Sequence, residues 1–138
     1  MTVPDDVTDE QYERLLGLRT GLRRFLAWSE AQARNEGITP AQHQLLLAVR
    51  GHPGGEPPTV GDVAEYLLLR PHSAGELVDR AAAAGLVERV ADEEDARVVR
   101  VGLTDEGARR LAALAAAHHE ELARLAPRMR SLWEGLGT

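Results

Sequence analysis

The feature that most constrains the fold of this chain is a change in the period of its hydrophobic pattern. Up to residue 85, apolar residues recur at the three- and four-residue spacing of amphipathic helices. After Gly85, the runs 86–91 and 98–103 are of strand type, and the second alternates apolar with polar residues. The helical spacing returns after Thr104. The pattern predicts helices, then a β-hairpin, then further helix, which is an α+β fold that is mainly helical.

Capping signals set the expected helix boundaries. Thr8 and Thr39 are each followed three residues later by Gln, so helices are predicted to begin after both. The first should end near Asn35, and the second should end before the GHPGGEPP loop at 51–58. A third helix opens after Thr59. Pro71 separates it from a fourth, expected at about 72–84 and ended by Gly85.

The C-terminal segment is expected to be helical from Thr104, which would be its N-cap. Pro127 is predicted to break this helix and leave a final short one. Near the other end, Gly17 and Gly21 have the spacing that lets two helices approach closely, at an interface between copies or as ordinary surface.

Length and composition predict a single domain over 1–138. The chain is 43% hydrophobic and 28% charged, both ordinary for a globular protein. It has no cysteine, which excludes disulfides and thiolate metal sites. No apolar run reaches the roughly 18 residues of a membrane span, and no signal peptide is visible at the start. We therefore expect a cytoplasmic protein that does not enter a membrane.

Three helices followed by a hairpin form a winged helix-turn-helix, here over 39–103. The fourth helix would enter a DNA major groove, and the polar loop at 92–97 would be the wing. The flanking segments 1–38 and 104–138 carry apolar stripes that need another partner. A second copy is the simplest one, so we expect them to be dimerisation helices of a two-fold homodimer on a palindromic operator.

The net charge of the chain permits DNA binding only through a small patch of its surface. The net charge is −6, which argues against a protein that coats nucleic acid. A hairpin turn centred between Glu94 and Asp95 would place Arg89 opposite Arg100 and so indicate an anionic partner such as DNA phosphate. The alternative is a register displaced by one residue, or neutralisation of the two arginines by nearby acids.

Several motifs, in order, resemble the MarR family of bacterial transcriptional regulators. They are Leu77–Arg80 (LVDR), Gly85–Arg89 (GLVER), Asp95–Arg97 (DAR) and Val101–Gly107 (VGLTDEG), preceded by Thr39–Gln42 (TPAQ) at the start of the second helix. The family pattern is close to LVDRL, GLVER, DxRDxR and VxLTxxG. The resemblance covers roughly residues 10–135.

The resemblance implies a homodimeric repressor that a small ligand releases from DNA. It matches Arg97 to the wing arginine of the minor groove and Asp95 to the acid that shapes the wing. His72, Ser73 and Glu76 would stand on the reading face, and Arg80 matches the helix arginine. Together with the phosphate contacts that we expect, the DNA-binding residues are Arg70, His72, Ser73, Glu76, Arg80, Arg89, Arg97 and Arg100.

The sequence departs from the family at the wing, where Glu94 replaces the first arginine and four acids occupy 92–95. This favours a rival hypothesis, a dimeric ligand- or protein-binding module that has lost DNA binding. Glu76 has two interpretations: it accepts a hydrogen bond from a cytosine amino group, or it forms a capping box with Ser73.

Ligand and metal sites are less defined. Phe25, Trp28 and His43 would line a pocket for a small aromatic ligand between the first, second and fifth helices, or simply belong to the core. His43 with His118 and a glutamate would make a metal-sensing regulator, a third alternative; we expect no metal and no cofactor. The phosphate-loop, dinucleotide, zinc-protease and nucleophile-elbow motifs are absent from the sequence, so we predict that the protein is not an enzyme.

Overall fold

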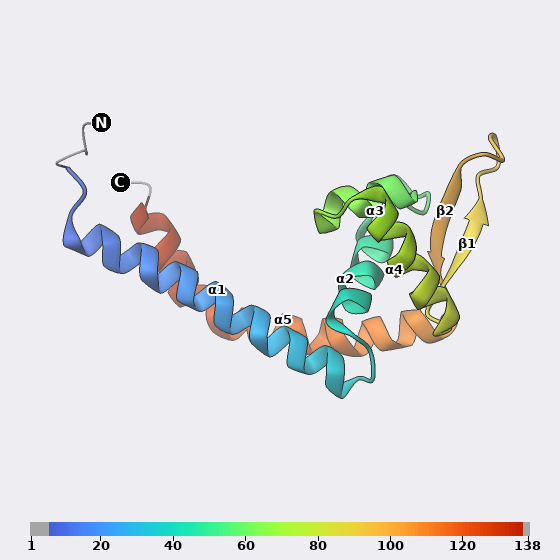
Figure 1. Cartoon of the computed structure of the whole chain (residues 1–138). Helices are drawn as coiled ribbons and strands as arrows, with labels where there is room; N and C mark the ends of the chain where they lie inside the picture. The colour runs from blue at the N-terminus through green and yellow to red at the C-terminus, as the bar shows by residue number, and fades with distance from the viewer. Residues whose placement is uncertain (1–5, 137–138) are drawn as a thin grey trace.

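The computed structural model describes residues 6–136, which form five helices and one hairpin (Figure 1). The elements are α1 (Asp9–Asn35), α2 (Pro40–Gly51), α3 (Val60–Leu67), α4 (Pro71–Ala83), β1 (Val87–Ala91), β2 (Val99–Leu103) and α5 (Asp105–Leu136). This order confirms the winged helix-turn-helix between two flanking helices.

The predicted caps form. Capping boxes join Thr8 to Gln11 and Thr39 to Gln42, and Thr59 closes a third box with Asp62. Gly85, which follows α4, has a φ of +78°, in the left-handed region where glycine carries no steric cost. The fourth helix begins one residue earlier than expected because Pro71 itself takes the first helical position, where its missing N–H is not needed.

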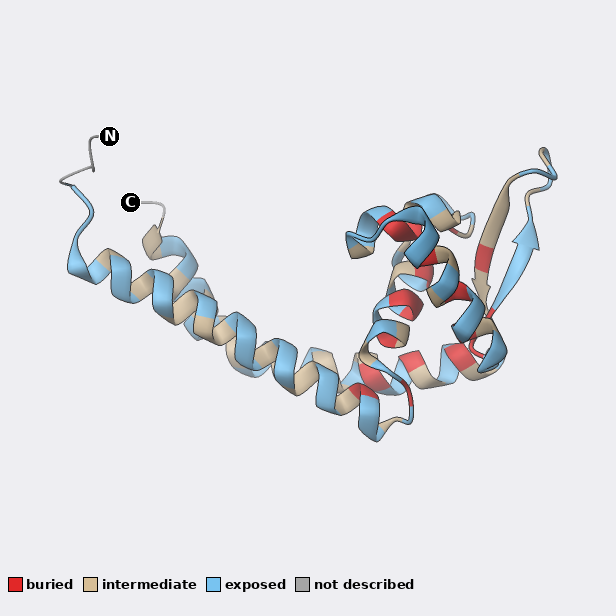
Figure 2. Cartoon of the chain, in the orientation of Figure 1, coloured by how far each residue is buried: buried red, intermediate tan, exposed pale blue. Residues whose placement is uncertain are grey.

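All buried residues among 6–136 lie between residues 33 and 114, the part that we call the body (Figure 2). Its core joins α2, α3, α4 and the base of the hairpin to the first turns of α5. The core side chains are mainly aliphatic: Ala33, Ile38, Leu45, Leu46, Val49, Val63, Ala64, Ala74, Val78, Ala81, Leu86, Val87, Val101, Leu111 and Leu114.

The other part is the arm, formed by α1 residues 9–32 and α5 residues 115–136, which lie side by side and extend away from the body (Figure 1). Gly17 and Gly21 allow this close approach within one chain. A Cβ at Gly17 would lie 3.2 Å from Leu132 Cδ2, and one at Gly21 would lie 2.8 Å from Met129 Sδ. Within residues 6–136, no helix is long and apolar enough to span a membrane.

The prediction that Pro127 breaks the last helix was wrong, because α5 continues to Leu136 with the proline inside it. Pro127 and Ala123, whose carbonyl loses its usual donor, are both exposed, so water can take the vacant hydrogen bond. Beyond the proline, Met129 and Leu132 pack against α1. Packing thus holds the segment in line despite the local cost of the proline.

Candidate nucleic-acid interface and ligand cavity

The α4 helix presents one exposed polar face. His72, Ser73, Glu76 and Arg80 are exposed, whereas Ala74, Val78 and Ala81 on the opposite face are buried in the core. The LVDR segment therefore contributes apolar residues to the core and charged ones to solvent. α4 is fixed to the body on one side and free for contact on the other.

The capping box expected between Ser73 and Glu76 does not form. Since Pro71 is the first helical residue, Arg70 is the N-cap, and it makes no side-chain capping bond. Glu76 instead pairs with His72, with His72 Nε2 lying 3.2 Å from Glu76 Oε1. The acidic group on the reading face thus lies beside His72, the second residue of the helix.

The hairpin register differs by one residue from the prediction. Arg89 lies opposite Val101, and Arg100 lies opposite Val90, so the two arginines point to opposite faces. The turn is centred on Asp95 because the Asp92 carboxylate accepts hydrogen bonds from the backbone N–H of Glu94 (3.1 Å) and Asp95 (3.0 Å). The two arginines therefore do not form a facing pair that would attract an anionic partner.

Arg89 joins the hairpin to the α4 helix. Its guanidinium donates to Asp79 Oδ1 across 2.7 Å, and both side chains remain partly exposed. This contact links β1 to α4, and a phosphate that approached Arg89 would compete with Asp79.

Arg100 joins the hairpin to the loop before α3. Its side chain is 20% exposed and donates to Asp92 Oδ1 (2.7 Å) and to the Pro57 carbonyl (2.8 Å), with Glu56 at 3.1 Å. The hydrogen bond from Arg100 is the main cause that lowers the pKa of Asp92. Sequence reasoning missed this role of Arg100 because its partners at 56 and 57 are more than 40 residues away in the chain.

Arg97 is the most exposed of the three arginines of the hairpin, with 90% of its side chain accessible, against 40% for Arg89 and 20% for Arg100. Asp95 Oδ1 accepts from the Arg97 backbone N–H (3.0 Å) and from Arg97 Nε (3.1 Å). These hydrogen bonds lower the pKa of Asp95. The arrangement shapes the tip of the loop and directs Arg97 outward.

Arg70 and Arg80 differ from the other three predicted DNA-binding arginines. Both are exposed, and neither forms an ion pair within residues 6–136. Of the eight predicted DNA-binding residues, the structure places six on or just before α4 or at the wing tip with exposed side chains. Arg89 and Arg100 are occupied by internal partners at the hairpin.

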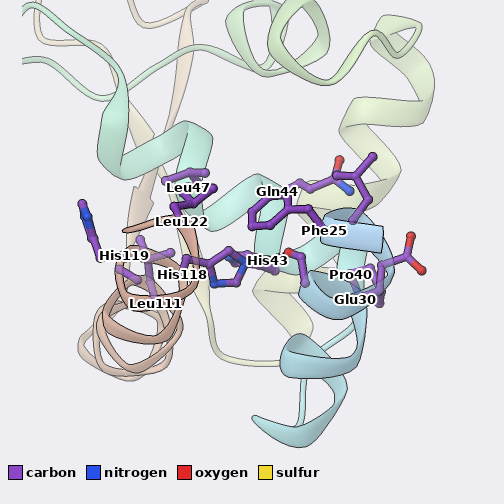
Figure 3. A pocket seen from close by; sticks show the side chains of 13 residues that line it. Phe25, Glu30, Pro40, His43, Gln44, Leu47, Leu111, His118, His119 and Leu122 are labelled. Carbon is purple, nitrogen blue, oxygen red and sulfur yellow. Dashed lines mark hydrogen bonds between the residues drawn. The ribbon is translucent and has the colours of Figure 1, made fainter. Parts of the chain in front are cut away.

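A cavity of about 590 Å³ lies between the body and the arm (Figure 3). Residues of α1, α2 and α5 line it: Phe25, Leu26, Ser29, Glu30, Pro40, His43, Gln44, Leu47, Leu111, Ala115, His118, His119 and Leu122. The volume is that of a site for a small organic molecule. Two of the three predicted residues, Phe25 and His43, line it, whereas Trp28 stacks on Phe25 with ring centroids 6.0 Å apart.

Two imidazoles stand together in this cavity (Figure 3). The ring centroids of His43 and His118 are 4.8 Å apart. Burial and then repulsion from His118 lower the pKa of His43, so its ring is neutral near pH 7. Sequence reasoning named both residues but missed Ser29, which bonds to His118 across 2.6 Å. The metal-sensing alternative gains no support, because residues 6–136 contain no group of three side chains that could hold a metal ion.

Comparison with known proteins agrees with this architecture. The model of the MarR family matches residues 36–98. The HTH-type transcriptional repressor MdtR of Bacillus subtilis is 32% identical over 72 residues, which are 52% of this chain and 44% of the repressor. The chain thus matches less than half of the length of that relative.

Solved structures extend the likeness to most of the chain. A crystal structure of a MarR family transcription regulator has a TM-score of 0.73 and 27% identity, over 86% of this chain and 77% of that one. The S. aureus MepR–DNA complex has a TM-score of 0.67 over 80% of each chain, and at 21% identity it bears on the fold alone.

Proposed function

We propose that this chain is a transcriptional regulator of the MarR family, whose model matches residues 36–98, and that it binds operator DNA as a homodimer. We further propose that it acts in the cytoplasm as a repressor on a palindromic site and is not an enzyme. The name of the Bacillus subtilis relative, a transcriptional repressor, supports the direction of regulation.

The observation that carries the proposal is the exposed face of α4 beside an outward-pointing wing arginine. His72, Ser73 and Glu76 stand at the start of α4, where a recognition helix contacts base edges. Arg97 would reach the minor groove, and the unpaired Arg70 and Arg80 would contact phosphates. MepR, which shares the fold, forms a complex with DNA.

The dimer is proposed from the arm. Its large apolar side chains remain exposed in one chain, among them Leu16 at 66% and Trp133 at 69%. Large apolar side chains that gather on one part of a soluble protein and stay open to water indicate a surface that a partner covers. A second copy would cover it and would set two α4 helices on successive turns of DNA. The exposed set on the arm is Tyr12, Leu15, Leu16, Leu22, Leu26, Leu122 and Trp133.

The cavity supports release by a small ligand. Arm residues from α1 and α5 form one wall, and α2 of the body forms another. A bound molecule would therefore set the angle between the dimerisation arm and the DNA-reading body. That angle fixes the spacing of the two α4 helices in a dimer, so occupancy would change the affinity for DNA.

The test is fluorescence anisotropy of the purified protein with the DNA upstream of its own gene, against scrambled DNA, at several salt concentrations. We expect sequence-dependent binding that Arg97→Ala weakens by about 1–3 kcal/mol, as for loss of a base contact. Arg109→Ala is the control, because Arg109 is also exposed and paired with an acid nearby in sequence, Glu106. Equal affinity for both DNAs at low salt would refute the proposal.

The rival function, a dimeric module that binds a ligand or protein but not DNA, has one observation in its favour. The wing contains four acids, which are Asp92, Glu93, Glu94 and Asp95. Arg97 already forms an ion pair with one of them, Asp95. Glu94→Arg distinguishes the two functions. A gain of DNA binding from none would favour the module, whereas a modest gain on existing specific affinity would favour the regulator.

A further inference from the structure

Glu76 is the central residue of the exposed face of α4. The three buried residues of the helix are Ala74, Val78 and Ala81. At about 100° per residue, Glu76 points almost directly away from them. Its side chain is 55% exposed. A partner that contacts this face of α4 therefore meets a carboxylate at the centre of the contact.

His72 engages one oxygen of this carboxylate and leaves the other available. His72 Nε2 lies 3.2 Å from Glu76 Oε1, about one helical turn away. Within residues 6–136, no group bonds to Glu76 Oε2. The capping bond that would have engaged Glu76 with Ser73 does not form. The carboxylate is thus held in place at one oxygen and keeps a free acceptor at the other.

The residue beside Glu76 is a glycine that the fold itself does not require. Gly75 lies inside α4 in a helical conformation, and a Cβ there would meet no heavy atom within 4 Å. Alanine would therefore fit, and it would make the helix more stable than glycine does. A partner whose atoms come close to the helix backbone gives a physical reason for the glycine.

A group that can only accept hydrogen bonds discriminates among the base edges of the DNA major groove. An ionised carboxylate is such a group. In the major groove, guanine presents two acceptors, and thymine presents an acceptor and a methyl group. Adenine presents a donor beside an acceptor, whereas cytosine presents only a donor, its N4 amino group. Cytosine is therefore the base whose edge fully complements Glu76.

We propose that α4 comes closest to DNA at Gly75, and that Glu76 selects a cytosine in each half of the operator by accepting a hydrogen bond from its N4 amino group. This inference rests on the proposed function, because it requires α4 to enter the major groove. DNA phosphates repel the carboxylate, so Glu76 contributes more to the choice of base than to overall affinity. Arg70 and Arg80, which are exposed and form no ion pair within residues 6–136, offset that repulsion.

Selection from a pool of duplexes with a randomised central segment tests the choice of base without a known operator. Purified full-length protein binds the pool, and the bound duplexes are sequenced. We expect the wild-type protein to select half-sites that share a cytosine at one fixed position. Glu76→Gln should change that base to adenine and leave the other positions unchanged, because a Gln amide pairs with adenine N6 and N7. Glu76→Ala should select no base there.

Fluorescence anisotropy measures the size of the preference. The two probes are the selected duplex and the same duplex with the cytosine pair replaced by an adenine pair. The wild-type protein should prefer cytosine by about 5- to 150-fold, and Glu76→Gln should prefer adenine. Glu120→Gln makes the same chemical change at an exposed acid of the arm, so this control should keep the wild-type preference.

Gly75→Ala tests the close approach separately. The added methyl group should weaken binding to the selected duplex at least about fivefold, comparable to the loss of one base contact, while the melting temperature of the protein rises. Gly51→Ala, at the end of α2 and also in open space, is the control and should not change the DNA affinity. A variant that melts higher but binds DNA more weakly has lost a contact and not its fold.

The possible failures of this inference and of the proposed function are distinct. If the wild-type protein selects a sequence but Glu76→Gln selects the same bases, Glu76 does not read cytosine and the inference is refuted. Unchanged DNA affinity in Gly75→Ala would refute the close approach. In both cases the regulator function stands, because the wild-type protein still selects a site. If the wild-type protein selects no sequence, the proposed function is refuted and this inference with it.

Discussion

The body and the arm are built from the same material, amphipathic helices, but they differ in what covers their apolar faces. In the body, aliphatic side chains of four helices and a hairpin enclose one another, so Leu45, Val78 and Val101 are fully buried. In the arm, two helices pack only on each other and contain no buried residue among those described (Figure 2). Two helices cannot enclose a core, so the body is complete in one chain and the arm is not.

The difference also explains where the cavity lies. It opens at the boundary between the two regions, where α1 and α5 leave the body and the side chains no longer close around a centre. Polar side chains therefore line it from both regions: His43 and Gln44 belong to the body, and Ser29, Glu30, His118 and His119 belong to the arm. A ligand there contacts both regions at once.

The largest expected effect contrasts two neighbouring leucines of α2. Leu46 is fully buried, and Leu47 is 56% exposed. Leu46→Ala should lower the free energy of unfolding by about 2–5 kcal/mol, because it removes apolar contacts and leaves a void. Leu47→Ala should change it by less than about 0.5 kcal/mol. Urea denaturation followed by circular dichroism measures both, and similar losses would mean that the body is not the independent core described.

The next effect concerns the arm. Leu16→Glu puts a charge into the proposed contact between copies, and it should raise the dimer dissociation constant about a hundredfold, or about 2.7 kcal/mol. Sedimentation velocity over a dilution series measures the change. Leu47→Glu is the control, since it places the same charge on a similarly exposed leucine of the body. A monomeric wild-type protein, or an equal shift in the control, would contradict the assignment of the arm.

Three helical glycines sharpen the comparison of packing. In the body, a Cβ at Gly107 would collide with the Leu86 carbonyl, which is fixed by the Thr104 N–H. Gly107→Ala should therefore cost about 1–3 kcal/mol of unfolding free energy. Gly21→Ala in the arm should cost less, because its neighbour is the end of the flexible Met129 side chain. Gly75→Ala, in open space on α4, should gain about 0.5–1 kcal/mol.

Thermal melting of the three glycine variants at one protein concentration gives the order of their stabilities. A cost for Gly21→Ala as large as that for Gly107→Ala would show that the arm is packed as rigidly as the body.

The smallest effect is a pH dependence within the body. Hydrogen bonds from Arg100 and from backbone N–H groups lower the pKa of Asp92 below its ordinary value of 3.8. The Asp92 carboxylate therefore stabilises the fold fully above that value, and the stabilisation is lost as the pH falls through the lowered pKa. Asp92→Asn should melt below wild type near neutral pH, and the gap should close in acid. Glu93→Gln, a neighbouring exposed acid, should show no such convergence.

Local rules in the sequence accounted for most of the secondary structure. Capping boxes at Thr8 and Thr39 placed two helices, Thr59 marked the start of a third, and the change of period after Gly85 placed the hairpin. These features depend on residues within four positions of one another, so neighbouring residues are enough to predict them. The same rules identified which face of α4 is buried and which is exposed.

The errors arose where distant residues decide the outcome. The predicted hairpin register was wrong by one residue, because the Asp92 carboxylate accepts hydrogen bonds from the turn and Arg100 bonds to the loop at 56–57. Pro127 stays within α5 because α1 packs beside the helix beyond it. Ser73 is not an N-cap because Pro71 fixes an earlier start of α4.

The sequence by itself therefore determined the elements, their order and the exposed face of α4, because periodicity and capping are local properties of the chain. Only the tertiary structure decided that α5 contributes Leu111 and Leu114 to the body and the rest of its length to the arm. It also brought His43 and His118 together across 75 residues to form the proposed ligand site. Contacts of this kind depend on how helices pack in space, and no spacing along the chain encodes them.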